Sequence, residues 1–170
     1  MKRFILIFML CFIGLCNPLK AQETVTIGSG TQTSSMVPVD LWNYYGQSQQ
    51  LFFSDEIGMD AGTITGISLK FYDVTNGSLS IEPVDGVPQP TRSFAIYMQN
   101  TDLTNMNDGY QVVNYAPSYS GTVTLVENGW TQFDFDTPFE YTGGNILVTI
   151  IDNSGYSAGD YYYHWFVFDN

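Results

Sequence analysis

The order of apolar and polar residues predicts a protein built from β-strands. Over most of the chain apolar residues alternate with polar ones, and clusters of Gly, Asn, Asp, Ser and Thr interrupt the alternation about every ten residues. A period of two places apolar side chains on one face of a strand, whereas an amphipathic helix needs a period near 3.6. We therefore expect an all-β fold, an antiparallel β-sandwich that is jelly-roll-like.

Two of the expected strands have distinctive patterns. Thr63–Tyr72 alternates well, but the spacing of its apolar residues slips at Gly66, where we expect a β-bulge. Asn145–Ile151 is apolar at nearly every position, which predicts burial on both faces. Further strands are expected at Glu23–Ile27, Leu41–Gly46, Gln50–Ser54, Ser93–Asn100, Ser120–Val126, Trp130–Asp136 and Tyr161–Phe168. The polar residues Gly46–Gln49 should form a turn between the second and the third of these strands.

A hairpin is expected late in the chain. The short segment "ENG" separates Ser120–Val126 from Trp130–Asp136, and a link of that length suits two paired strands. In the second strand Phe133 and Phe135 should face the core, and the aspartates that alternate with them should face solvent. We also expect Trp130, which opens this strand, in the core.

The N-terminal segment has the pattern of a signal peptide. A basic start precedes the apolar run Phe4–Leu15, which is too short to span a bilayer, and cleavage is expected between Ala21 and Gln22. Residues 1–21 are then the signal and residues 22–170 a single domain, secreted or held at the cell surface. The rival interpretation is an outer-membrane lipoprotein acylated at Cys16.

Removal of this segment changes the charge and the cysteine count. Both cysteines lie within it, so the remaining chain has no disulfide. The formal net charge falls from −12 to −15, because only Lys70 and Arg92 remain against 17 acidic residues. Nucleic-acid binding needs clustered basic residues and is therefore excluded, and an anionic membrane surface is disfavoured. A carboxylate-rich surface suits divalent cations, but it is equally typical of a plain solvated surface.

The sequence does not predict an enzyme. Without a cysteine after cleavage, thiol catalysis is excluded. His164 is the one histidine, it lies in an aromatic strand, and the chain has no Gly-x-Ser-x-Gly motif. Carboxylates are plentiful, but nothing in their spacing singles out a catalytic pair.

No cofactor is required by the sequence, and a structural calcium ion is the one candidate. The segment "DLTNMNDG" gathers hard oxygen ligands at Asp102, Asn105, Asn107 and Asp108. Its spacing is not that of an EF-hand. The alternative is an ordinary turn, because Asp, Asn and Gly are turn residues in any case.

Aromatic residues suggest a ligand-binding surface. Sugars stack on exposed rings, and the candidate platforms are Trp42, Tyr44, Tyr45 and Trp165. The alternative is structural, because aromatic residues are also favoured in strands. In the strand Tyr161–Phe168 the side chains alternate, so one half of its rings should be core and the other half exposed, and the pattern leaves open which half is which.

The segment "YSGTVTLVENGWTQFDFDTPFEYTGGNILVTIIDNSG" carries a resemblance, together with the earlier "SDEIGMDAGTITGISLKFY" and "FAIYMQNTDLTNM". It resembles a β-sandwich module of exported surface proteins of gut and oral anaerobes, found with fibronectin type III domains and with gingipain-like and haemagglutinin-like adhesins. The similarity covers most of residues 23–160 and departs at "NGSLSIEPVDGVPQP". It implies a surface module without a catalytic motif. Such modules normally continue into further strands, which favours a domain truncated at its C-terminus or a short stand-alone member.

These observations favour a non-catalytic exported or cell-surface module in adhesion or ligand binding. Its partner would be a glycan or an extracellular protein. Two alternatives remain open: a carbohydrate-binding module, and a purely structural spacer domain of a longer protein.

Overall fold

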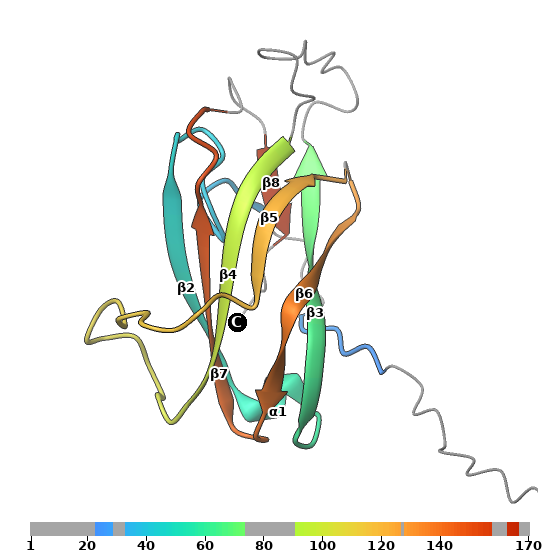
Figure 1. Cartoon of the computed structure of the whole chain (residues 1–170), viewed down its shortest axis with the longest axis vertical. Helices are drawn as coiled ribbons and strands as arrows, with labels where there is room; N and C mark the ends of the chain where they lie inside the picture. The colour runs from blue at the N-terminus through green and yellow to red at the C-terminus, as the bar shows by residue number, and fades with distance from the viewer. Residues whose placement is uncertain (1–22, 29–32, 74–90, 127, 158–162, 167–170) are drawn as a thin grey trace, which may run out of the picture.

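The computed structural model describes residues 23–28, 33–73, 91–126, 128–157 and 163–166, and at 72–73 and 163–166 it describes the backbone alone. Two four-stranded antiparallel sheets face each other as a sandwich (Figure 1). The first sheet has the order β1-β8-β3-β6, and the second sheet has the order β2-β7-β4-β5. The prediction of an all-β antiparallel sandwich is confirmed. The elements are β1 (Thr33–Ser34), β2 (Gly46–Phe52), α1 (Ser54–Ile57), β3 (Gly62–Asp73), β4 (Thr91–Thr101), β5 (Tyr119–Thr124), β6 (Trp130–Tyr141), β7 (Asn145–Asp152) and β8 (Tyr163–Phe166).

The strands pair in a nested order. β4 pairs with β5, β3 with β6, β2 with β7 and β1 with β8, and each of these pairs is antiparallel. The innermost pair is β4 and β5, and each further pair takes the preceding strand from the first half of the chain and the following strand from the second half. Successive nested pairs belong to alternate sheets, so that the two halves of the chain build both layers together.

The core lies between the two sheets, and rings join its two sides. On β4 the side chains of Phe94, Ile96 and Met98 are buried, as the alternation predicts. Phe133 of β6, in the first sheet, is fully buried and makes an edge-to-face contact with Phe94 in the second sheet, with the ring centroids 5.7 Å apart. A second edge-to-face contact, at 5.3 Å, joins Phe133 to Tyr119 of β5. Such contacts add to the hydrophobic stabilisation that burial of the rings provides.

The predicted burial of β7 on both faces is confirmed. Ile146, Val148 and Ile150 belong to the hydrophobic core, whereas Leu147 and Thr149 point to the opposite face of the sheet. Leu147 and Thr149 are nevertheless 1% and 0% exposed. Hence the outer face of the second sheet is covered at this height, and the cover comes from the segment 102–118 described below.

The predicted bulge at Gly66 is also confirmed, because the pairing of β3 with β6 shifts register between Ile64 and Gly66. A Cβ atom at position 66 would lie 2.6 Å from the carbonyl oxygen of Phe133. Only glycine leaves room for this close approach of two backbones.

The predicted hairpin across "ENG" is wrong. β5 pairs with β4 in the second sheet, whereas β6 pairs with β3 in the first sheet. The chain therefore crosses from one sheet to the other between these strands. The short link is sufficient because facing sheets are only about 10 Å apart.

Four further expectations are corrected. Residues 23–28 form no strand, and the strand expected at Leu41–Gly46 is wrong because residues 41–45 lie in turns and bends. β2 begins at Gly46 and runs through the polar residues that we expected to form a turn; their side chains are satisfied by neighbours, as when Gln49 donates to Thr149 Oγ1 at 2.9 Å. Trp130 is 51% exposed rather than buried. The alternation that turns Phe133 inward turns Trp130 outward, since the two positions differ by an odd number of residues.

The predicted signal peptide, with Cys16 of the rival lipoprotein interpretation, lies outside the described residues. Within the described part of the chain, no helix has the length and apolar character needed to cross a membrane.

Candidate functional site

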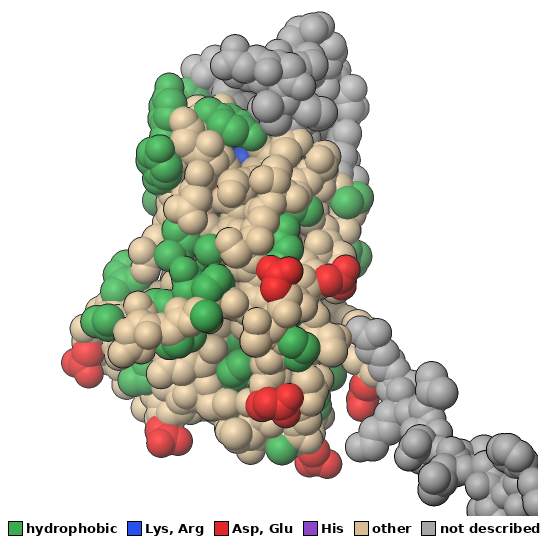
Figure 2. Space-filling view, viewed as in Figure 1, with side chains coloured by type: hydrophobic (Ala, Val, Ile, Leu, Met, Phe, Trp, Pro, Cys, Tyr) green, Lys and Arg blue, Asp and Glu red, His purple; other side chains and the backbone are tan. Residues whose placement is uncertain are grey.

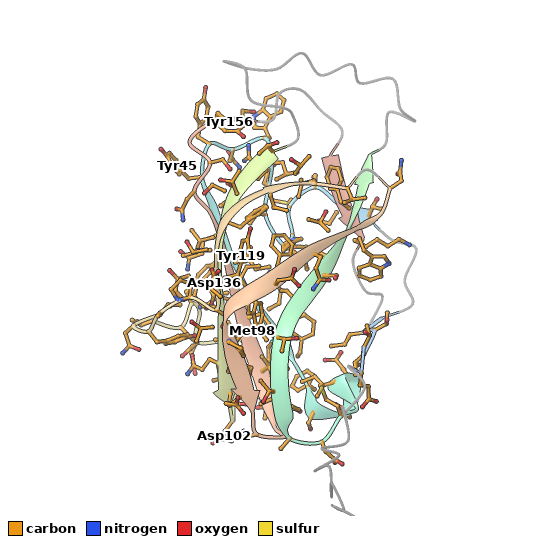
Figure 3. The ribbon with its side chains drawn as sticks, turned by 45° about the vertical axis from the view of Figure 1, so that its right-hand side comes forward. Tyr45, Met98, Asp102, Tyr119, Asp136 and Tyr156 are labelled. Atoms are coloured by element: carbon orange, nitrogen blue, oxygen red, sulfur yellow. The ribbon has the colours of Figure 1, made fainter. Side chains whose placement is uncertain are left out.

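Three of the predicted platform residues come together at one end of the sandwich. Trp42, Tyr44 and Tyr45 lie in the segment that leads into β2, and their exposed fractions are 48%, 61% and 66%. We call these three residues the aromatic end. Tyr45 lies beside Tyr156 at this end, and Asp102 lies at the opposite end of the molecule (Figure 3).

A carboxylate shapes the turn that presents these rings. Asp40 Oδ1 accepts a hydrogen bond from the backbone N–H of Trp42 at 3.0 Å, and Oδ2 accepts one from the side-chain amide of Asn43 at 2.9 Å. The N–H of Asn43 also donates to the carbonyl oxygen of Asp40, at 3.2 Å. This is the local side-chain-to-backbone bonding by which aspartate stabilises turns.

A buried arginine fixes this turn from beneath. Arg92 on β4 is fully buried, and its Nε donates to Asp152 Oδ2 at 2.9 Å, while Nη2 forms an ion pair with the same oxygen. Nη2 also donates to the carbonyl oxygen of Asn43 at 3.0 Å, and Nη1 donates to that of Tyr156 at 2.6 Å. The guanidinium lies 5.2 Å from the centre of the Tyr156 ring. One side chain thus joins the segment 40–45 to the segment 152–157.

The segment 152–157 reinforces the same arrangement. Asp152 Oδ1 accepts hydrogen bonds from the N–H of Ser154 at 2.9 Å and from its hydroxyl at 2.5 Å. The N–H of Gly155 donates to the carbonyl oxygen of Tyr44 at 2.9 Å, and a Cβ atom at Gly155 would lie 3.2 Å from the Tyr45 hydroxyl. The aromatic end is therefore held before any ligand arrives, which lowers the entropic cost of binding.

The role of Arg92 was missed at the sequence level, although a signal for it exists. Arg92 has the same parity as Phe94 and Ile96, so an inward position follows from the alternation of the strand. An arginine that points into a sandwich must be paired. Its partner, Asp152, has the parity of the core-facing residues of β7, so its inward position could also have been predicted from the sequence.

Trp165, the fourth predicted platform residue, is placed by backbone register alone. It pairs with Phe71, which is fully buried, and its neighbour His164 pairs with Tyr72. Directly opposed residues share a face of the sheet, so position 165 belongs to the core-facing side of the first sheet. Its side chain is outside the described part of the structure, and its ligand-binding role stays a prediction.

The predicted calcium residues lie in the segment 102–118, which connects β4 to β5. Asp102, Asn105, Asn107 and Asp108 are all exposed, and Asn105 Oδ1 accepts a hydrogen bond from the N–H of Asn107 at 3.0 Å. Throughout the described residues, no three His, Cys, Asp or Glu side chains gather as a metal site would require. Calcium binding at these positions stays a prediction.

Asp102 also borders an open, polar hollow of about 390 Å3, at the end of the sandwich opposite the rings. Its walls come from the end of β4 and from the turn between β6 and β7, and its lining is Gln99, Asn100, Thr101, Asp102, Thr142 and Gly144. The side chain of Asn100 is structural, because it donates to the carbonyl oxygen of Glu140 at 2.8 Å and accepts from the N–H of Thr142 at 3.0 Å. The hollow offers no ring to stack on a ligand.

The segment 102–118 is bound to the outer face of the second sheet. The side chain of Gln49 on β2 accepts from the N–H of Gln111 at 2.7 Å and donates to the carbonyl oxygen of Gln111 at 2.9 Å. Further along, Tyr115 donates to Gln99 Oε1 at 3.2 Å and packs edge-to-face on Tyr97, with the ring centroids 6.0 Å apart. Burial, with a smaller contribution from Tyr97, raises the pKa of Tyr115.

Comparison of the chain with protein-family models, with curated protein sequences and with solved structures gives no match.

Proposed function

We propose that this protein is a non-catalytic, exported or cell-surface module that binds an extracellular ligand through its aromatic end. The observation that carries the proposal is the exposure of three rings on a turn that the buried Arg92–Asp152 pair anchors. Exposed Trp and Tyr side chains on a rigid support are typical of binding hot spots. The resemblance to surface-protein modules and the predicted signal peptide support the same assignment.

Charge narrows the class of ligand. Lys70 and Arg92 are the basic residues of the described part of the chain, and Arg92 is fully buried. Against 17 acidic residues in the sequence, this leaves little to attract a polyanion. We therefore propose a neutral glycan or an extracellular protein as the partner, rather than nucleic acid or an anionic polymer.

We also propose that the sandwich is a jelly roll. The nested pairing of β1 with β8, β2 with β7, β3 with β6 and β4 with β5 supports this finer description. A double-sheet jelly roll contains eight strands in two Greek keys, and its loops gather at the two ends of the sandwich. The aromatic end would then be one of these two loop ends, a common place for binding residues on a rigid scaffold.

A binding screen with matched tryptophan variants tests the proposal. The secreted form is screened on an array of glycans and host matrix proteins, and Trp42→Ala is compared with Trp130→Ala. We expect Trp42→Ala to weaken binding at least about tenfold, because it removes a stacking ring worth roughly 1.4 kcal/mol or more.

Trp130 is the control because it is 51% exposed, close to the 48% of Trp42, but lies on β6 in the other sheet. Its replacement should leave affinity unchanged. Equal losses in the two variants, or binding that neither affects, would contradict the assignment of the site. A folded protein that binds nothing on the array would favour the structural-spacer alternative.

A further inference from the structure

The aromatic end continues onto the outer face of the second sheet. Tyr45 immediately precedes β2 and shares the parity of Gln47 and Gln49, whose side chains point away from the core. Tyr110, in the segment 102–118, donates its hydroxyl hydrogen to the carbonyl oxygen of Gln47 at 2.9 Å, and its side chain is 63% exposed. A fourth exposed ring is therefore fixed against β2 at Gln47, which lies two residues after Tyr45 in the sequence.

The position of Tyr110 is determined by a separate contact. The two hydrogen bonds between the Gln49 side chain and the backbone of Gln111 imitate those of a neighbouring strand. Because Gln111 follows Tyr110 directly, these bonds hold the Tyr110 backbone as well. Figure 2 shows hydrophobic side chains gathered at the loop end beside β2 and again over the segment 102–118.

The two chain segments that form this surface carry no charge. Residues 41–54 and 109–126 contain no Asp, Glu, Lys or Arg, in a chain with 17 acidic residues. The other sheet differs, because β6 exposes Asp134, Asp136 and Glu140. The carboxylate of Asp40, just before the rings, is occupied by hydrogen bonds from Trp42 and Asn43. Asp108 lies just before the second uncharged segment.

Amide side chains lie between the rings. Asn43 and Gln47 are exposed, and the amide group of each can both donate and accept hydrogen bonds. Rings that stack on the C–H faces of sugars, interleaved with amides that exchange hydrogen bonds with hydroxyl groups, match a polyhydroxylated ligand without charge. A charged ligand would require compensating charges, and the described segments 41–54 and 109–126 carry none.

We infer that the aromatic end and Tyr110 form one extended site for a neutral glycan chain that runs along the start of β2. This inference rests on the proposed function and specifies its ligand. Trp42, Tyr44 and Tyr45 bind one stretch of the glycan, and Tyr110 binds a stretch further along the glycan. Affinity then depends on chain length, because only a longer chain reaches Tyr110.

Calorimetric titration with neutral oligosaccharides tests the inference. Cello-, xylo-, malto-, manno- and chito-oligosaccharides are titrated from disaccharide to octasaccharide against the protein and its variants. We expect affinity to rise with length by at least about tenfold before it levels off. Tyr110→Ala should abolish this rise and leave the affinity for the shortest bound oligosaccharide unchanged, whereas Trp42→Ala should weaken all lengths.

Two control variants distinguish a loss of binding from a loss of folding. Tyr110→Phe keeps the ring and loses the hydrogen bond to Gln47, so it should retain most of the length dependence. Trp130→Ala removes an equally exposed ring from the other sheet and should change nothing. The thermal midpoint and the circular dichroism spectrum of each variant establish that it is folded.

The outcomes separate the two proposals. If Trp42→Ala weakens binding but length and Tyr110 do not matter, the extended site is wrong and the aromatic end stands. Binding to a matrix protein with no binding to any neutral oligosaccharide overturns the glycan assignment and leaves the proposed function in place. Oligosaccharide binding that ignores both Trp42 and Tyr110 overturns both.

Discussion

Arg92 supports the exposed aromatic end although its own side chain is fully buried. Its guanidinium bonds to Asp152 and to the carbonyl oxygens of Asn43 and Tyr156, so the two segments at the aromatic end share one buried anchor. A buried charge is costly unless its hydrogen bonds are complete. The arrangement is therefore sensitive to the loss of either partner, and far less sensitive to the loss of both.

Replacement of the ion pair tests this anchor. Arg92→Met leaves Asp152 buried without its cation and should lower the free energy of unfolding by about 3–5 kcal/mol. Arg92→Met combined with Asp152→Leu should recover a substantial part of that loss, because no uncompensated charge remains. Urea unfolding measures both. A double variant no more stable than the single one would show that the carbonyl contacts, rather than the ion pair, dominate.

At the level of elements, alternation located most of the strands but did not identify their partners. It placed β3, β4, β6 and β7 and it anticipated the bulge at Gly66, because a single strand carries that information in its own sequence. It failed for the pairing of β5 and β6, because a short link serves a hairpin and a crossing between facing sheets equally well. It also failed at β2, whose polar residues resemble a turn until their hydrogen-bond partners are known.

The candidate site, too, could be predicted only in part, because some of its residues depend on contacts between distant segments. Three of its rings, Trp42, Tyr44 and Tyr45, were predicted from the chemistry of the side chains. Tyr110 was not, because its place beside Gln47 depends on how a long connection lies over the sheet. No periodicity in the segment 102–118 encodes that contact, and the bonds that hold the neighbouring Gln111 come from Gln49 on another element.

The attachment of this segment to β2 can be measured. Gln49→Ala removes both hydrogen bonds to the backbone of Gln111, and each is worth roughly 1 kcal/mol net. We expect hydrogen exchange at the Gln111 amide to accelerate at least about tenfold, with a smaller change at the amides of β4 and β7. Gln50→Ala, a neighbour whose amide bonds to Ser48 instead, is the control. Unchanged exchange at Gln111 in Gln49→Ala would mean that other contacts hold the segment.

On the scale of the whole molecule, charge is distributed unevenly between the two sheets. The uncharged segments 41–54 and 109–126 belong to the second sheet and its cover, while β6 in the first sheet exposes three carboxylates. An excess of one sign destabilises the compact state by self-repulsion. The acidic surface therefore favours solubility and lowers the stability of the fold.

Salt should relieve this repulsion. Screening lengths fall from about 30 Å at 0.01 M ionic strength to about 10 Å at 0.1 M, so exposed carboxylates interact less as salt is added. The buried Arg92–Asp152 pair is shielded from solvent ions and should be little affected. We expect the thermal midpoint to rise by several degrees over this range, measured in sodium chloride at pH 7. A midpoint that falls would show that favourable surface ion pairs outweigh the repulsion.

The nested pairing of the strands also determines when the fold can form. β4 and β5 are the innermost pair, and each later pair joins segments further apart in the chain, ending with β1 and β8. Contacts between distant segments form slowly, because the chain must close long loops before burial compensates for the lost entropy. While the chain is being synthesised, the second sheet cannot be completed until β7 has emerged, and the first sheet cannot be completed until β8 has emerged. If the protein is exported, as we propose, this late completion keeps the sandwich unfinished while the chain is made, and an unfolded chain is the state that a narrow export channel can accept.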